Sequence, residues 1–299
     1  MAQRLGPALP AFALCVPLIC SQTEFWANFI PKLVNTWHCF TKPRLYRYLS
    51  PMRILVTGAT DGIGKATADA LAAAGHNVII HGRPADESGE PGRKALDAVA
   101  ELTERHPNVE INVVTGDLAS LASVDRMAKT IRDMYPDLDR LVLNAGVLTR
   151  QRAVSADGYE LNLAVNHLAH TLLTIRLVDI LAKNAPSRIV FVSSMVHEHG
   201  KINWSDINWT RQFNPSGAYA QSKVANVMVT RVLAEKLQNR GITVNALHPG
   251  VINTKLLHVL YAGGAPVESG ARTSVYLTTT DEVDGVTGRY FSDGRERPS

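Results

Sequence analysis

The sequence has little cysteine, and all of it lies at one end. The three cysteines fall within residues 1–51 of the 299-residue chain, so residues 52–299 have none. That part of the chain therefore needs neither a disulfide framework nor a metal site built on thiolates. The length and a hydrophobic content of 45% indicate a globular protein with one large domain or two small ones.

Residues 52–299 also lack an excess of charge of either sign. The chain has a formal net charge of +4, but five of its 31 basic and one of its 27 acidic residues lie in residues 1–51. The remaining 26 charges of each sign cancel, so composition offers no reason to bind nucleic acid. We expect no nucleic-acid partner.

Long hydrophobic runs are missing as well. Leu5–Cys20 is apolar but is interrupted by three prolines, whereas a membrane-spanning helix needs about 20 apolar residues. This run could be a secretion signal, and the aromatic and basic residues between Phe25 and Arg47 could rest on a membrane surface. We favour an N-terminal extension, residues 1–51, that lies outside the fold of a cytoplasmic protein, with membrane association through this segment as the alternative.

The stretch Met52–Lys65 organises the rest of the chain. Ile54–Val56 predicts a buried strand, a turn with three glycines follows, and a helix then runs to Gly75. Strand, glycine turn and helix form the geometry of a dinucleotide site, because glycine lets the backbone approach a pyrophosphate and the helix N-terminus supplies N–H groups. The G-x-x-x-G-x-G spacing alone also fits an ordinary strand-to-helix turn.

Strands and helices then alternate to the end of the chain. Further strands are expected over residues 78–80, 109–114, 141–143, 189–192, 242–247 and 290–291, and further helices around Leu96, Val99 and Leu102 and over 124–134, 159–181 and 219–238. This order predicts a single α/β domain over residues 52–299, with a doubly wound, Rossmann-type parallel sheet. Ligands bind outside the carboxyl ends of such strands, which is where the distinctive motifs fall.

Tyr219 and Lys223 lie four residues apart at the start of a predicted helix, so they share one face. A phenol with a pKa near 10 is a poor base at neutral pH, but a cation one turn away favours the phenolate and lowers that pKa. The tyrosine could then exchange a proton with an alcohol or carbonyl group. A Tyr-x-x-x-Lys pair alone is also common on exposed helices.

Together the motifs resemble the short-chain dehydrogenase/reductase family over essentially all of residues 52–299. The matching segments are Thr57–Gly64 (Thr-Gly-x-x-x-Gly-x-Gly), Asn144–Gly146 (Asn-Ala-Gly), Ser194, Tyr219–Lys223 and Pro249-Gly250. More narrowly, Val165–His170, Ser193–His197 and Glu268–Arg272 resemble the retinol dehydrogenase-like branch. The branch does not fix the substrate.

The resemblance implies hydride transfer between a nicotinamide cofactor and an alcohol or carbonyl group of a fairly apolar small molecule. It implies that Tyr219 exchanges the proton, Ser194 holds the substrate oxygen, Lys223 binds the ribose and Asn166 holds a water. The cofactor-binding residues that it implies are Gly58, Thr60, Asp61, Gly62, Ile63, Gly64, Arg83, Asp117, Leu118, Asn144, Ala145, Gly146, Tyr219, Lys223, Pro249, Gly250 and Thr254. It also implies a homo-oligomer and requires no metal. A catalytically idle, cofactor-sensing or scaffolding protein is the alternative, but the intact catalytic set argues against it.

Cofactor choice depends on the end of the second strand. An acidic residue there would accept the ribose 2′-hydroxyl of NAD, whereas arginine suits the 2′-phosphate of NADP. Gly82 occupies the place of the acid and Arg83 follows, which favours NADP over NAD. Asp61 departs from this pattern, because many similar NADP enzymes carry Arg or Lys at its position.

Two further features remain. The pairs His197 with His199 and His167 with His170 have no nearby cysteine or carboxylate cluster at metal-ligand spacing, so we expect solvated or hydrogen-bonded histidines and no metal. The segment 252–267 is apolar in parts and contains two consecutive glycines. We expect it to cover the substrate.

Overall fold

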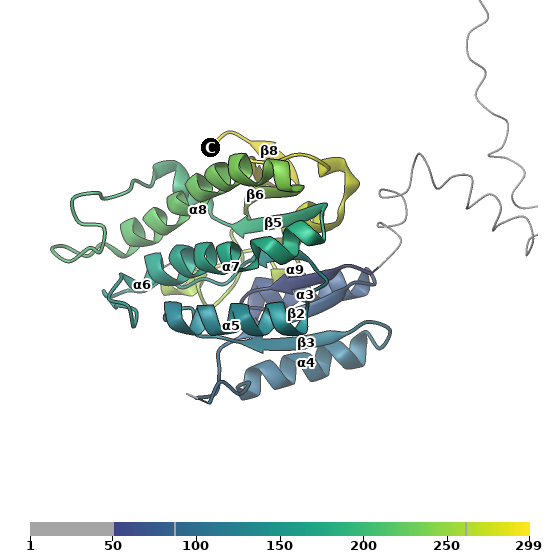
Figure 1. The fold of residues 1–299 in the computed structure, drawn as a ribbon. Helices are drawn as coiled ribbons and strands as arrows, with labels where there is room; N and C mark the ends of the chain where they lie inside the picture. The colour runs from purple at the N-terminus through teal and green to yellow at the C-terminus, as the bar shows by residue number, and fades with distance from the viewer. Residues whose placement is uncertain (1–50, 87, 261) are drawn as a thin grey trace, which may run out of the picture. The chain divides into compact units, whose positions relative to one another are not determined.

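The computed structural model describes residues 51–299 except 87 and 261, and our predictions for the N-terminal extension lie outside the described residues. Met52–Ser299 is built on one eight-stranded sheet with the order β3-β2-β1-β4-β5-β6-β7-β8 (Figure 1). The strands are β1 (Arg53–Val56), β2 (Asn77–Gly82), β3 (Ile111–Thr115), β4 (Leu138–Leu143), β5 (Ser187–Val192), β6 (Ile242–His248), β7 (Tyr290–Ser292) and β8 (Arg295–Arg297). All neighbouring strands are parallel except β7 and β8, so the predicted doubly wound fold is confirmed.

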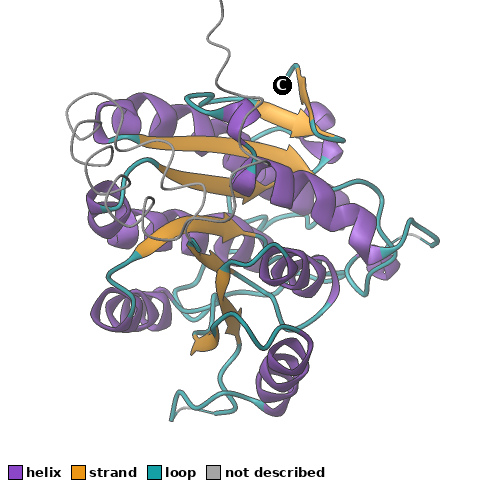
Figure 2. Ribbon diagram, turned by 90° about the vertical axis from the view of Figure 1, so that its right-hand side faces the viewer, coloured by secondary structure: helices purple, strands orange, loops and turns teal. Residues whose placement is uncertain are grey.

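Helices cover both faces of the sheet (Figure 2). They are α3 (Gly62–Ala73), α4 (Arg93–Arg105), α5 (Leu121–Met134), α6 (Leu161–Leu163), α7 (Ala169–Lys183), α8 (Pro215–Leu237) and α9 (Val267–Thr279). Successive strand residues point to opposite faces, so Leu55 packs with α5 and α7 whereas Ile54 and Val56 pack with α3 and α4. Both faces are buried, which explains the continuous apolar strands. None of the helices within the described residues is long and apolar enough to cross a membrane.

The predicted helix over 159–181 is found over residues 161–183, but its first part is not a regular α-helix. The structure has the short α6, a π-helical turn over Ala164–Leu168 and only then α7. The Glu160 carboxylate caps α6 by accepting hydrogen bonds from the backbone N–H groups of Asn162 and Leu163, both at 2.9 Å. Single π-turns inside helices often occur at functional sites, and this one contains Asn166.

Other helix boundaries differ from the predicted ones for local reasons. α5 begins at Leu121 rather than 124 because the Ser120 side chain caps it. α8 begins at Pro215, with Asn214 as its cap, so Tyr219 lies in the second turn. In α4 the predicted buried face is displaced, since Leu96 is 49% exposed. α9 and β8 were not predicted.

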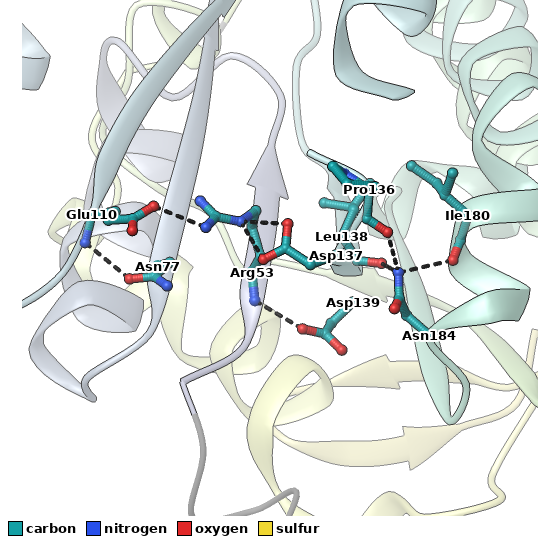
Figure 3. A network of polar contacts seen from close by, with 9 residues as sticks. All are labelled: Arg53, Asn77, Glu110, Pro136, Asp137, Leu138, Asp139, Ile180 and Asn184. Carbon is teal, nitrogen blue, oxygen red and sulfur yellow. Dashed lines mark hydrogen bonds and ion pairs between the residues drawn. The ribbon is translucent and has the colours of Figure 1, made fainter. Parts of the chain in front are cut away.

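A polar network ties the amino ends of β1 to β4 together (Figure 3). Arg53, the first residue of β1, donates hydrogen bonds to Asp137 before β4 at 2.9 Å and to Glu110 before β3 at 2.8 Å. Its backbone N–H donates to Asp139 at 2.9 Å, and Asn184 donates to backbone carbonyls at the start of β4. These contacts hold the amino ends of the strands together, although Nη1 of Arg53 is buried without a hydrogen-bond partner. The opposite edge of the sheet carries the cleft described next.

Candidate functional site

A cleft of about 1640 Å³ lies along the carboxyl ends of the strands. Every cofactor-binding residue that the sequence predicts lines it, from Gly58 in the glycine turn to Thr254 after β6. Ser194, Tyr219 and Lys223 line it too. Asn166 does not line the cleft but lies directly behind it, since a Cβ added to Gly146 would be 3.4 Å from its Oδ1.

The glycine turn is a cradle that side chains would fill. A Cβ on Gly64 would lie 2.3 Å from the Gly58 carbonyl oxygen and 2.4 Å from Nδ2 of Asn144, so only glycine fits there. Gly58 and Gly62 have φ angles of +63° and +54°, which favour glycine. The outer side of Gly62 is open to the cleft, because an added Cβ would meet only the Thr254 methyl group, at 3.7 Å. This cradle at the N-terminus of α3 fits the phosphates of a dinucleotide.

Thr57 joins the glycine turn to the catalytic side of the cleft. Its Oγ1 accepts hydrogen bonds from the backbone N–H groups of Asn144 and Ala145, at 2.9 and 3.0 Å, and lies 3.0 Å from Nε2 of His170. The other ring nitrogen of His170, Nδ1, lies 3.1 Å from the carbonyl oxygen of Asn166 and donates to it. This assigns the neutral tautomer in which Nε2 accepts the Thr57 hydroxyl proton. Burial lowers the pKa of His170 to about 3, in keeping with that tautomer.

Lys223 is buried and held at both ends by the end of β5. Its Nζ donates to the Val192 carbonyl at 2.9 Å, and its own carbonyl accepts from the Ser193 hydroxyl at 2.8 Å. The ammonium group lies 5.5 Å from the centroid of the Tyr219 ring. Burial lowers the pKa of Lys223 to about 8. The lysine is therefore protonated at neutral pH beside the tyrosine.

The side-chain amide and the backbone carbonyl of Asn166 both form hydrogen bonds with protein groups. Its side chain accepts from the Val147 N–H at 2.7 Å and donates to the Val147 carbonyl at 2.9 Å and to the Ser222 hydroxyl at 3.0 Å. Its carbonyl oxygen accepts from Asn226 at 3.0 Å as well as from His170. The π-turn thus ties the loop after β4 to α8, which carries Tyr219 and Lys223.

Ser194 lies two residues after the end of β5 and caps the short helix Met195–His199. Its Oγ accepts a hydrogen bond from the backbone N–H of Val196 at 3.4 Å. Nδ1 of His197 lies 2.7 Å from the Ser194 carbonyl oxygen, and the His197 ring packs on Tyr290 with a centroid distance of 4.4 Å. Val196 therefore holds the hydroxyl of Ser194, and His197 holds its carbonyl oxygen.

Part of the cleft lining is apolar, with Val147, Leu148, Met195, Val196, Leu256 and Leu257 among the residues that form it, and the histidines His199, His248 and His258 line the cleft as well. Two of these, Leu256 and Leu257, come from the segment that follows Gly250. Backbone hydrogen bonds join the two ends of this segment: the Asn253 N–H donates to the Ala265 carbonyl at 2.9 Å, and the Ala265 N–H donates to the Val251 carbonyl at 2.8 Å. Such a lining suits a substrate with a largely hydrocarbon surface.

Sequence reasoning missed two positioning histidines. His81 is buried at the end of β2, where Nδ1 accepts from the Gly58 N–H at 3.1 Å and Nε2 donates to the Gly116 carbonyl at 3.0 Å. His170 joins Thr57 to Asn166 as described above. Neither role follows from spacing. A histidine inside an otherwise apolar strand, as His81 is, was the one available signal.

Known proteins match this chain in sequence and in structure. The family model described as short chain dehydrogenase matches residues 52–263. Retinol dehydrogenase 14 of Homo sapiens is 40% identical over 265 residues, which cover 81% of this chain and 78% of that protein. Retinol dehydrogenase 13 of Homo sapiens is 38% identical, covering 82% and 77%.

Among solved structures, one described as a candidate NAD(P) dependent gluconate 5-dehydrogenase from Beutenbergia cavernae, with bound NADP, has a TM-score of 0.66 at 27% identity. It covers 82% of this chain and 95% of that one. The sequence matches and the shared fold agree with the motifs that line the cleft. This chain therefore belongs to the short-chain dehydrogenase family, in its retinol dehydrogenase-like branch, and is an oxidoreductase of alcohol and carbonyl groups that uses a nicotinamide cofactor.

Proposed function

We propose that this protein is an NADP-preferring oxidoreductase whose substrate is a fairly apolar alcohol or carbonyl compound. The observation that carries the proposal is that Ser194, Tyr219 and Lys223 line one cleft with the glycine turn. The apolar part of the cleft lining supports the substrate class, as do relatives that are named retinol dehydrogenases. An idle scaffold is not favoured, because every member of the catalytic set is present.

The bound cofactor supplies or accepts the hydride, and the side chains manage the substrate oxygen and its proton. Tyr219 donates a proton to that oxygen in reduction and removes it in oxidation. Ser194 holds the same oxygen by a hydrogen bond. Lys223, a buried cation beside the Tyr219 ring, stabilises the phenolate form and binds the cofactor ribose.

For Asn166 we propose a positioning role. Its carbonyl oxygen accepts two hydrogen bonds and both its amide hydrogens are donated to protein atoms. A carbonyl oxygen has two lone pairs, so little capacity is left there for the water that the resemblance implied. We infer that Asn166 sets the position of α8 relative to the loop after β4.

Replacing Tyr219 by phenylalanine tests the chemistry. Tyr219→Phe deletes the exchangeable proton and almost no volume, so folding and cofactor binding should stay nearly intact. General acid–base catalysis is worth about 10² to 10⁴-fold, and turnover of apolar aldehydes and ketones, followed by loss of NADPH absorbance, should fall by at least that factor. A loss below about tenfold with chemistry rate-limiting would contradict the assignment.

Arg83 supports the NADP preference. It is exposed at the end of β2, lines the cleft, and makes no hydrogen bond or ion pair with any residue that the structure describes. Charge-assisted bonds contribute roughly 1.5 to 3 kcal/mol, so Arg83→Ala should raise the KM for NADPH by about one to two decades and leave that for NADH nearly unchanged. Wild-type protein that prefers NADH would refute this reasoning. Gly82→Asp is a poorer probe, because its Cβ would lie 2.8 Å from the Thr60 methyl group and 3.1 Å from Cβ of Ala95.

We also propose that the protein is a homo-oligomer that associates through α7 and α8. These helices expose Ile175, Met228 and Val232, each 46–51% accessible, on the same face of the sheet. Met228 and Val232 are four residues apart and therefore share a helix face. Sedimentation of wild type and of a Met228→Lys, Val232→Glu double variant distinguishes a dimer or tetramer from a monomer.

A further inference from the structure

We propose that Lys94 and Lys255 complete the binding site for the 2′-phosphate of NADP, and that Asp61 holds both lysines when this phosphate is absent. The inference rests on the proposed NADP preference. It assigns a specificity role to two lysines that no cofactor motif in the sequence marks.

The contacts come from three separate elements. One carboxylate oxygen of Asp61, Oδ2, accepts from Lys255 Nζ at 2.6 Å and from Lys94 Nζ at 3.2 Å. Asp61 is the N-cap of α3, Lys94 lies in the first turn of α4, and Lys255 lies in the segment after Gly250. The two lysines are therefore brought to one point beside the glycine turn.

This point lies at the adenosine end of the cleft. A Cβ on Gly82 would be 2.8 Å from the Thr60 methyl group, so the end of β2 touches the residue that precedes Asp61. A Cβ on Gly92 would be 3.5 Å from the Arg83 carbonyl oxygen, so the start of α4 touches the residue after β2. Arg83, Lys94 and Lys255 all line the cleft. The lysines thus reach the corner where Arg83 was expected to bind the 2′-phosphate.

The charges at this corner do not balance without an anion. Three other cations that line the cleft each have a carboxylate: Lys65 pairs with Glu101, Arg93 with Asp97, and Arg105 with Asp69. Lys94 and Lys255 instead share Asp61, and with Arg83 they leave two positive charges in excess. A phosphate monoester carries about −1.5 to −2 at pH 7, which matches that excess.

The start of α4 adds to this preference for an anion. Its N-cap, Gly92, makes no side-chain cap, and its first turn contains no acidic residue but begins with Arg93 and Lys94. Cations at the positive end of a helix are unfavourable unless an anion lies nearby. A phosphate at this place would offset the unfavourable charge of Arg93 and Lys94 at the helix N-terminus and would accept hydrogen bonds from the backbone N–H groups of the first turn.

The pairs on Asp61 are weak enough to be exchanged. The side chains of Asp61, Lys94 and Lys255 are 51%, 69% and 81% exposed, and such exposed ion pairs contribute little. Lys255 in particular holds the pKa of Asp61 down at about 2, so the carboxylate is charged at neutral pH and competes with a phosphate for both lysines. Removing its charge should therefore strengthen phosphate binding.

Three adenosine ligands separate the phosphates in the test. Binding of AMP, ADP and 2′,5′-ADP to the full chain is measured by isothermal titration calorimetry. The Kd ratio of AMP to 2′,5′-ADP reports the 2′-phosphate, and the ratio of AMP to ADP reports the pyrophosphate. Lys94→Gln and Lys255→Gln should each lower the first ratio roughly 3- to 10-fold and change the second less than about twofold. Asp61→Asn should raise the first ratio by a similar factor, and asparagine caps α3 as well as aspartate does.

Lys129→Gln is the matched control, because it removes the same charge from α5, where Lys129 pairs with Asp133 at 2.6 Å. Lysine variants that change the first ratio no more than this control would overturn the inference. An equal fall in both ratios would place the lysines on the pyrophosphate and overturn it too, as would weaker 2′,5′-ADP binding by Asp61→Asn. A wild-type first ratio near one refutes the NADP preference itself, whereas a large ratio that responds only to Arg83→Ala leaves that preference standing without the lysines.

Discussion

Lowering the pH should destabilise this protein through His170, and the effect can be isolated. The ring is fully buried between the Thr57 hydroxyl and the Asn166 carbonyl. The Thr57 oxygen already accepts two backbone N–H groups, and its own proton goes to Nε2 of the histidine at 3.0 Å, a shorter contact than the 3.5 Å to the Val142 carbonyl. If the ring were protonated, Nε2 would become a second N–H donor, and it would have no free acceptor on Thr57. Burial accordingly lowers the pKa of His170 to about 3.

The magnitude follows from the two pKa values. Above pH 6.5, the ordinary histidine pKa, the ring is neutral in both states, and the shift contributes nothing. Below it the unfolded chain binds a proton that the folded chain refuses, so the free energy of unfolding falls by about 1.4 kcal/mol per pH unit until the pH reaches the folded-state pKa. Between neutral pH and pH 5 the loss is about 2 kcal/mol.

Urea unfolding of wild type and His170→Gln at pH 7 and pH 5 measures this loss. The variant is expected to be less stable than wild type at pH 7. Because glutamine cannot titrate, the difference in the free energy of unfolding between the two proteins should be about 2 kcal/mol smaller at pH 5 than at pH 7. His81, His167 and His248 also have pKa values lowered by burial, but they are present in both proteins and cancel in the difference. A gap that is the same at both pH values would refute the neutral, buried His170.

Three other expectations can be checked directly. A protein that begins at Met52 should keep full activity and an unchanged Tm, because we place the domain boundary after residue 51. If this shorter protein does not fold, the boundary lies elsewhere. If it no longer binds vesicles that the full chain binds, the extension has a membrane role. Hydrogen exchange over 252–267 should slow when cofactor and substrate are both bound, and equal protection in the free protein would argue against a lid. Gly82→Asp should lower the free energy of unfolding by about 1 to 3 kcal/mol through its contacts with Thr60 and Ala95, as chemical denaturation would show.

Most of the fold could be predicted because the local pattern and the tertiary structure agree. The strands are continuous apolar runs buried on both faces, and most motifs with special chemistry come soon after one of them, the exception being Tyr219 with Lys223 on α8. A parallel sheet collects these strand ends at one edge, so order along the chain was enough to assemble the cleft. The same reasoning placed Tyr219 and Lys223 correctly, since their spacing sets a shared helix face wherever the helix begins.

What could not be predicted depends on contacts between distant segments. The π-turn around Asn166 looks like ordinary helix in sequence, and the side chains that bond it come from Val147 and Ser222, 19 and 56 residues away. His170 bonds Thr57, which is 113 residues away. No period or capping rule marks such residues, because each is chosen by the shape of a buried site and not by its neighbours in the chain.

Under our proposal, the contacts of Asp61 would reverse the interpretation that the sequence suggests. In sequence it argues against NADP, since an acidic side chain beside the glycine turn would repel a phosphate. In the structure the same carboxylate gathers Lys94, which is 33 residues away, and Lys255, which is 194 residues away. Lys255 is followed directly by Leu256, which is part of the apolar lining of the cleft. We therefore expect any contact that fixes Lys255 at the adenosine end to restrain the segment that we expect to cover the substrate, so that cofactor choice and substrate closure would be linked through one loop.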